Sequence, residues 1–199
     1  MKKTRWMLGV LFVLAACQNS QASSGLTVKP AELSEEGEVL AKQIYADFKM
    51  FYTLDGSIGE DEVVVASMTT YENGKETAEA LSTFESWEGG AFEEALHSFQ
   101  LLRSEEGVDF IIGSPEGYVA SSHSGQGEKE EMGYIFQSLE QEETLEKGRP
   151  LYVGYVKGST GNSLEAPGIG DAHTFPEDLK QAEEAIVLEL QIKNKHDIE

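Results

Sequence analysis

The sequence predicts a mainly β protein, an antiparallel β-sandwich or barrel-like domain with one or two short helices. Three observations favour this class. Residues 44–54 alternate apolar and polar side chains, residues 62–71 are rich in β-branched residues, and glycine-containing turns recur at short spacing. Together these patterns predict about eight or nine strands.

The first predicted elements are a short helix over residues 33–40 and a strand over residues 44–54. Within the strand every even position is apolar, while Asp47 and Lys49 occupy odd positions. A period of two indicates a strand that is buried on one face only. Residues 55–59 then predict a turn because they contain two glycines and an aspartate.

A β-hairpin is predicted around Asn73 and Gly74, which separate residues 62–71 from residues 75–84. Asn-Gly between two strand-like runs is a strong hairpin signal, because both turn positions require a positive φ angle.

Residues 91–103 fit two structures. Phe92, Ala95, Leu96, Phe99 and Leu102 fall on one helical stripe. The segment also opens a series of short runs separated by glycine-containing turns, as in a meander of strands. The turns favour the strand, and the helix remains the alternative.

The rest of the chain continues the strand pattern. Residues 122–131 are predicted as a polar loop, and residues 158–175 as the longest irregular stretch. Pro176 followed by two acidic residues predicts the start of a short helix at residues 176–179. Further strands are predicted at residues 108–112, 118–121, 134–139, 151–156 and 185–193.

The amino terminus predicts export. Lys2, Lys3 and Arg5 precede an apolar run over residues 6–16, and residues 14–17 have the sequence Leu-Ala-Ala-Cys. The run is about half of the roughly 20 apolar residues that a spanning helix requires. A basic start, a short apolar run and small residues before the cleavage point are typical of a signal peptide.

The Leu-Ala-Ala-Cys motif resembles the lipobox of bacterial lipoproteins. The resemblance implies that residues 1–16 are a lipoprotein signal peptide and that Cys17 carries a diacylglycerol and palmitate-type anchor. The general pattern is similar to small lipoproteins of uncharacterised function from Gram-positive bacteria. It implies a location on the outer face of the bacterial cell membrane, or in the outer membrane if the host has one, since Gln18 is not the aspartate linked to inner-membrane retention.

Three regions are expected along the chain. Residues 1–16 form the signal peptide, residues 17–37 a lipidated flexible tether, and residues 38–195 a single β-rich extracytoplasmic domain. A tether of about 20 polar residues spans roughly 25 Å on average, which keeps the domain close to the membrane. Cys17 is the only cysteine, so we expect a fold without disulfides.

The charge of the chain excludes some partners. The signal peptide holds three of the 15 basic residues and none of the 36 acidic residues, so the mature chain has a formal net charge of −24. Nucleic acid is not expected as a partner because phosphate binding requires a basic patch. The same charge opposes docking on anionic lipid and favours solubility or cation binding.

Motifs for enzymatic chemistry are sparse. The sequence contains neither His-Glu-x-x-His nor Gly-x-Ser-x-Gly, and it predicts no catalytic residue, cofactor or defined metal site. We expect His97 to be structural. Weak divalent cation binding is a possible property of the acidic run at residues 60–62, or of Asp171 and His173 with a remote carboxylate.

Four residues are candidates for a binding loop. They are Trp87, His123, Asp171 and His173. Trp87 lies beside two glycines, where an aromatic ring can anchor a partner. The expected function is a non-enzymatic binding or interaction module with an envelope protein as partner. The alternatives are an extracytoplasmic hydrolase that uses carboxylates and a cation-binding or solute-binding lipoprotein.

Overall fold

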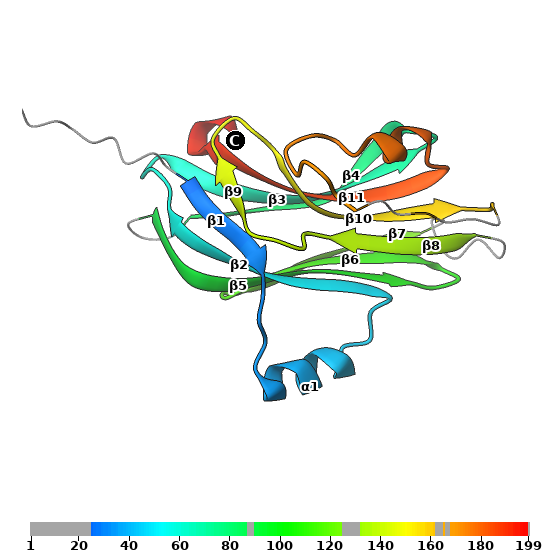
Figure 1. Ribbon diagram of the computed structural model, residues 1–199, viewed down its shortest axis with the longest axis horizontal. Coiled ribbons are helices and arrows are strands. Elements are labelled where there is room, and N and C mark those ends of the chain that lie inside the picture. Colours follow the sequence, from blue (N-terminus) through cyan, green and yellow to red (C-terminus); the bar gives the residue numbers. More distant parts are fainter. Residues whose placement is uncertain (1–24, 87–89, 125–131, 162–164, 166–167, 199) are drawn as a thin grey trace, which may run out of the picture.

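The computed structural model describes residues 25–86, 90–124, 132–161, 165 and 168–198. Within these residues two antiparallel sheets face each other, which confirms the predicted mainly β fold (Figure 1). The strands are β1 (Gly25–Pro30), β2 (Phe48–Ser57), β3 (Glu62–Glu72), β4 (Lys75–Glu85), β5 (Ala91–Arg103), β6 (Gly107–Ser114), β7 (Gly117–Ser124), β8 (Gly133–Ser138), β9 (Glu143–Glu146), β10 (Leu151–Ser159) and β11 (Glu184–Asn194). The helical elements are α1 (Glu35–Gln43), the 3₁₀ turn η2 (Glu177–Gln181) and the 3₁₀ turn η3 (Lys195–Asp197).

The strand order joins distant parts of the chain. The six-stranded sheet has the order β7-β6-β5-β2-β1-β9, and the five-stranded sheet has the order β4-β3-β11-β10-β8. The carboxyl-terminal strand β11 therefore lies in the middle of its sheet, between β3 and β10.

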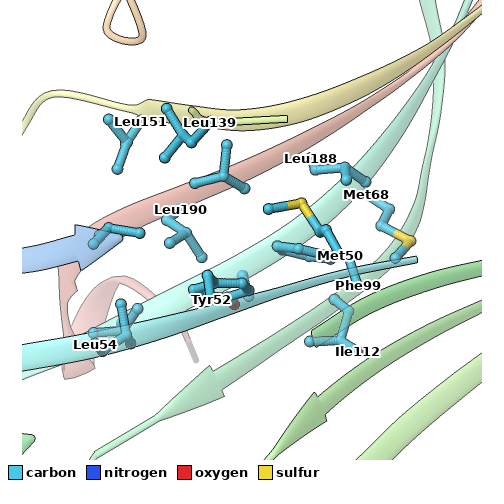
Figure 2. Close-up of a cluster of buried hydrophobic side chains, with 14 of the residues drawn as sticks. Met50, Tyr52, Leu54, Met68, Phe99, Ile112, Leu139, Leu151, Leu188 and Leu190 are labelled. Atoms are coloured by element: carbon cyan, nitrogen blue, oxygen red, sulfur yellow. The ribbon is translucent and has the colours of Figure 1, made fainter. Parts of the chain in front are cut away.

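The main core fills the space between the two sheets. Met50, Tyr52 and Leu54 of β2 are buried at alternate positions, as the period of two predicts. Figure 2 shows these side chains pointing toward those of the facing sheet, including Leu188 and Leu190 of β11. The removal of these apolar side chains from water is the main stabilising contribution, since the described residues contain no cysteine.

A second, smaller core covers the outer face of the five-stranded sheet. Leu179 of η2 packs with Tyr155 and Val187, which point away from the main core. Because both faces are covered here, the central strands β10 and β11 have nearly continuous runs of buried residues.

The predicted hairpin is confirmed. β3 and β4 are antiparallel neighbours, and the turn between them places Asn73 at φ 50° and Gly74 at φ 71°. An added Cβ at Gly74 would lie 1.9 Å from the carbonyl oxygen of Lys180. Glycine is therefore required both by the turn and by the close approach of η2.

The predicted tether is too long. Residues 25–30 form β1, which pairs with β2 on one side and with β9 on the other. Leu26 and Val28 are fully buried in the main core. The sequence prediction was wrong here because these are the only two buried side chains in a short strand with polar surroundings. The strand β9 was also not predicted, since Leu145 is its only buried residue.

The short helix forms close to its predicted place, at Glu35–Gln43 rather than residues 33–40. Ser34 caps its start by accepting a hydrogen bond from the backbone nitrogen of Gly37 at 3.1 Å. Ile44 ends the helix, which explains why β2 begins at Phe48 and not at residue 44 as predicted. The helix α1 projects from the sandwich and has no buried residue (Figure 1).

Residues 91–103 form a strand, β5, and a β-bulge explains their helix-like pattern. Leu54 of β2 pairs with Ala95 and Gly56 pairs with Phe92, so two β5 residues oppose Asp55. One of them, Glu94, has φ 47°. The extra residue puts Phe92 and Ala95 on the same face, which mimics a helical spacing of three.

Several chain segments meet at one end of the sandwich, which we call the amino end. Gly25 pairs with Ser57 and with Glu146, and Ser57 pairs with Ala91. The carboxyl-terminal turn η3 lies at the same end (Figure 1). The chain segment that precedes Gly25, which includes Cys17, therefore joins the fold at the amino end.

Candidate functional site

The first half of β5 has an open edge. β5 pairs with β2 from Ala91 to Leu101, but with β6 only from Ser98 to Arg103. The β6–β7 hairpin turns at residues 114–117, so β5 runs past its tip (Figure 1). Among the described strands, residues 91–97 have no neighbour on that side. Such an edge presents backbone donors and acceptors that can pair with another extended chain.

A hollow of about 680 Å³ lies along this edge. It is lined by residues 91–96 of β5 and by Ser114 and Pro115 of the hairpin turn. Leu96 is 44% exposed there, although most leucines in this fold are buried. We call this hollow and the open edge of residues 91–97 the β5 groove.

The rim of the β5 groove is acidic. Glu93 and Glu94 both line it, and no basic residue does. Glu94 forms an ion pair with Lys29 at 3.0 Å, and its backbone nitrogen donates to the Asp55 carboxylate at 3.2 Å. These contacts hold the bulge in place. Glu93 makes no ion pair with the described residues, so one carboxylate of the rim is available to a partner.

A polar cluster beneath the groove keeps β5 in position. His97 is buried, and its Nε2 lies 2.8 Å from Oε2 of Glu85 in β4. Its Nδ1 lies 2.8 Å from the carbonyl oxygen of Ala95, so this nitrogen donates. The ring stacks on Tyr52, and burial raises the pKa of Tyr52 well above its ordinary value. His97 thus links the two sheets, in agreement with the structural role expected from the sequence.

His123 is not part of the β5 groove. It belongs to β7, and its Nε2 lies 3.0 Å from the carbonyl oxygen of Ala80 in β4. Its ring meets Phe110 edge-on. The contact with Ala80 joins β7 and β4, the edge strands of the two sheets, so His123 lies where these two edges meet.

Asp171 and His173 lie close together but shape a turn. The Asp171 carboxylate accepts hydrogen bonds from the backbone nitrogen of His173 at 3.1 Å and from Oγ1 of Thr174 at 2.9 Å. The backbone hydrogen bond is the main cause that lowers the pKa of Asp171. Nδ1 of His173 donates to the carbonyl oxygen of Pro150 at 2.9 Å.

In the acidic run at residues 60–62, the Glu62 side chain already has partners within the chain. The Glu62 carboxylate accepts from Lys147 at 2.7 Å and from the backbone nitrogen of Gly59 at 2.7 Å. In the described part of the chain no group of three His, Cys, Asp or Glu side chains is placed to hold a metal ion. Two other candidates, Cys17 and Trp87, lie outside the described residues.

A buried ion pair marks the opposite end of the sandwich. Nη2 of Arg103 donates to Glu184 at 2.9 Å, and its guanidinium lies 3.6 Å from the ring centre of Tyr134. Nε and Nη1 of Arg103 have no hydrogen-bond partner. None of the hollows described for this chain opens at this guanidinium. The pair joins the two sheets and offers no described space for a ligand.

The projecting helix α1 carries a second apolar surface. Val39 and Leu40 of α1, and Tyr45 just after it, are all more than half exposed. None of these residues lines a described hollow, and Val39 and Leu40 use their backbone groups within the helix. This surface therefore offers a partner fewer contacts than the β5 groove.

Three other hollows differ in charge. One beside β8 is lined by Glu140 and Glu143 without a basic residue. One beside η2 has Lys157 against three acidic residues. In contrast, a hollow of about 450 Å³ at the amino end is lined by Lys147, Arg149 and Lys193 with Asp197 as its only acidic residue.

The comparisons with protein families, curated proteins and solved structures find no match for this chain. None of the helices in the described residues is long and apolar enough to span a membrane.

Sequence reasoning did not find the β5 groove. The signal that could have indicated it is the interrupted alternation at Glu93 and Glu94, followed by an apolar Leu96 on the polar face. The open edge depends on where the β6–β7 hairpin ends relative to β5, and this register is a tertiary property.

Proposed function

We propose that this protein is a lipid-anchored extracytoplasmic binding module that captures an extended segment of an envelope protein in the β5 groove. The segment would add a strand to the six-stranded sheet beside residues 91–97. The observation that carries the proposal is the open β5 edge next to an apolar hollow. Main-chain hydrogen bonds would supply affinity, and alternate side chains of the segment would supply specificity.

The chemistry of the groove defines the segment it would accept. Seven residues at about 3.3 Å each give an edge of about 23 Å, which suits a segment of similar length. Ala91, Leu96 and Pro115 would contact apolar side chains on one face of the segment. Glu93 and Glu94 favour lysine or arginine at neighbouring positions. The expected ligand is an extended segment that alternates apolar and basic residues.

Peptide selection on the mature chain with Cys17→Ala tests the groove. We expect selected peptides to alternate apolar and basic residues. The double variant Leu96→Arg, Glu93→Lys should weaken their binding at least about tenfold, a loss of about 1.4 kcal/mol. A matched control, Leu40→Arg with Glu79→Lys, makes the same chemical changes on α1 and β4 and should leave binding unchanged.

Two results would reject the proposal that the β5 groove binds the peptides. One is equal binding by the Leu96→Arg, Glu93→Lys variant and the parent protein. The other is loss of binding in the control on α1 and β4, because that result would assign recognition to a different surface.

The anchor is tested separately. Cells grown with a palmitate analogue should incorporate it into the protein through Cys17, and Cys17→Ala should abolish incorporation and release the protein from the membrane. Membrane attachment that survives Cys17→Ala would reject the lipid anchor and leave the groove as an independent proposal.

A further inference from the structure

We infer that the basic hollow at the amino end binds the negatively charged phosphates of anionic lipid headgroups. The amino end of the domain would then rest on the membrane surface. This inference rests on the proposed anchoring through Cys17, and it adds an orientation of the domain that anchoring alone does not provide.

The hollow stands out by the sign of its charge. Its lining has a formal charge of +2, since Lys147, Arg149 and Lys193 outnumber Asp197. The β5 groove and the hollow beside β8 each have a lining charge of −2. On a chain with a net charge of −21, three basic residues around one hollow provide local complementarity to an anion.

One basic residue of the hollow is held by contacts within the fold, and the other two can bind an anion. Nζ of Lys147 is held by Glu62 at 2.7 Å and by Oδ1 of Asn194 at 2.6 Å. Arg149 is about half exposed and lies 3.5 Å from Glu146, a long contact that competes weakly with a phosphate. Lys193 makes no ion pair with the described residues. Arg149 and Lys193 can therefore donate to a phosphate that enters the hollow.

The strand order explains why the hollow exists. β11 pairs with β10 only as far as Leu190, so no described strand pairs with residues 191–194 on that side. The turn from β9 to β10 crosses from one sheet to the other here, and residues 147–150 form the opposite wall. A phosphate would sit between this turn and the end of β11.

The position of Gly25 brings the hollow close to the membrane. Gly25 pairs with Glu146, the residue before Lys147. Cys17 precedes Gly25 by eight residues in the sequence. Eight residues span about 15 Å on average and at most about 29 Å. An anchor at Cys17 would hold the amino end, with its hollow, near the headgroups.

The net negative charge of the domain does not oppose this orientation. At physiological ionic strength charges interact over about 8 Å, so only the groups nearest the surface sense the lipid. The acidic residues elsewhere are repelled from anionic lipid, while the basic hollow is attracted. Both effects turn the amino end toward the membrane, which refines the expectation from total charge alone.

A fluorescence experiment on the lipidated full chain tests the inference. His196→Cys places a single reactive thiol for a dye on an exposed side chain next to Asp197, because Cys17 is blocked by its lipid. The protein is reconstituted in vesicles of phosphatidylcholine, or of equal parts phosphatidylcholine and phosphatidylglycerol, with a quencher on the headgroups. We expect strong quenching only with phosphatidylglycerol, and its loss in high salt.

Substitution of the available cations provides the specific test. Each basic residue near an anionic surface favours docking by about fivefold, so Arg149→Gln with Lys193→Gln should lower the docked-to-undocked ratio roughly 30-fold. Lys75→Gln with Lys180→Gln makes the same charge change at exposed sites outside the hollow and should retain quenching. Equal quenching in both double variants would overturn the inference.

Two further readouts separate the possible failures. Co-flotation with pure phosphatidylcholine vesicles reports the lipid anchor. Loss of co-flotation would reject lipidation of Cys17 but not phosphate binding in the hollow. Thermal unfolding with inorganic phosphate reports a soluble anion. Stabilisation by phosphate that requires Arg149 and Lys193, without quenching on phosphatidylglycerol, would assign the hollow to a soluble ligand and overturn its role at the membrane.

Discussion

The His97–Glu85 pair shows how one buried contact connects the β5 groove to the rest of the fold. Glu85 belongs to β4 and His97 to β5, so their 2.8 Å contact crosses between the sheets. Both nitrogens of the imidazole face acceptor oxygens, one from Glu85 and one from Ala95. The carboxylate therefore satisfies a polar group that would otherwise be buried without a partner.

Glu85→Ala should lower the free energy of unfolding by about 1–3 kcal/mol, because it leaves a buried imidazole nitrogen unsatisfied. Glu85→Gln should cost much less, since a glutamine amide can still hydrogen bond to Nε2. Urea unfolding measures both values. Glu79→Ala on the exposed side of β4 is the matched control and should change stability by no more than about 0.5 kcal/mol. Similar losses for Glu85→Ala and Glu79→Ala would contradict this role.

Glu189 gives a pH-dependent prediction. Burial is the main cause that raises its pKa above the ordinary value of 4.5, and Glu76 and Glu79 add to the effect. A carboxyl with a raised pKa in the folded state disfavours folding once the pH exceeds its unfolded value. Glu189→Gln should therefore raise the melting temperature at neutral pH and leave it unchanged well below pH 4.5.

The control for this measurement is Glu116→Gln, an exposed carboxyl in the β6–β7 turn. It should have no effect at either pH. A Glu189→Gln variant that is less stable than the parent at neutral pH would mean that the charged carboxylate stabilises the fold.

Individual site residues were hard to predict for a clear reason. The partners of His123 and His173 are the carbonyl oxygens of Ala80 and Pro150, which lie 43 and 23 residues away in the sequence. A histidine in a polar segment looks the same whether it binds a ligand or a distant backbone oxygen. His97 was easier, because it lies within residues 91–103, which the sequence predicts to be a strand or a helix.

At the scale of elements, the local sequence was enough to predict some strands and insufficient to predict others. The Asn73-Gly74 turn predicted its hairpin because the positive φ angles are a property of those two residues. β1 and β9 are short and become strands only by pairing with each other and with β2. Their formation depends on long-range pairing, which a local sequence pattern does not record.

The strand β1 can be tested directly. Leu26→Ala should lower the free energy of unfolding by about 2–5 kcal/mol, since Leu26 is fully buried in the main core. Thr27→Ala on the other face of the same strand should cost much less. Denaturant unfolding distinguishes the two. If Leu26→Ala were neutral, residues 25–30 would behave as the flexible tether that the sequence predicted.

At the scale of the whole molecule, the acidic surface limits stability. The formal net charge of −21 means that the excess acidic side chains repel one another in the folded state, and salt screens this repulsion. The melting temperature should rise as sodium chloride increases from about 0.1 M to about 1 M, over which the screening length falls from about 10 Å to about 3 Å. A fall in melting temperature over this range would contradict the prediction.

Calcium chloride at matched ionic strength separates screening from cation binding. Screening alone predicts equal stabilisation by both salts. A larger effect of calcium would support the alternative of a cation-binding lipoprotein.

The β5 groove is proposed to receive a segment of another protein. Photo-crosslinking in cells tests this proposal, with a photoreactive amino acid at position 96 in the groove, position 40 on α1 or position 79 on β4. We expect one dominant crosslinked envelope protein from position 96 and little product from the other two positions. A dominant product from position 40 alone, or equal products from all three positions, would contradict it.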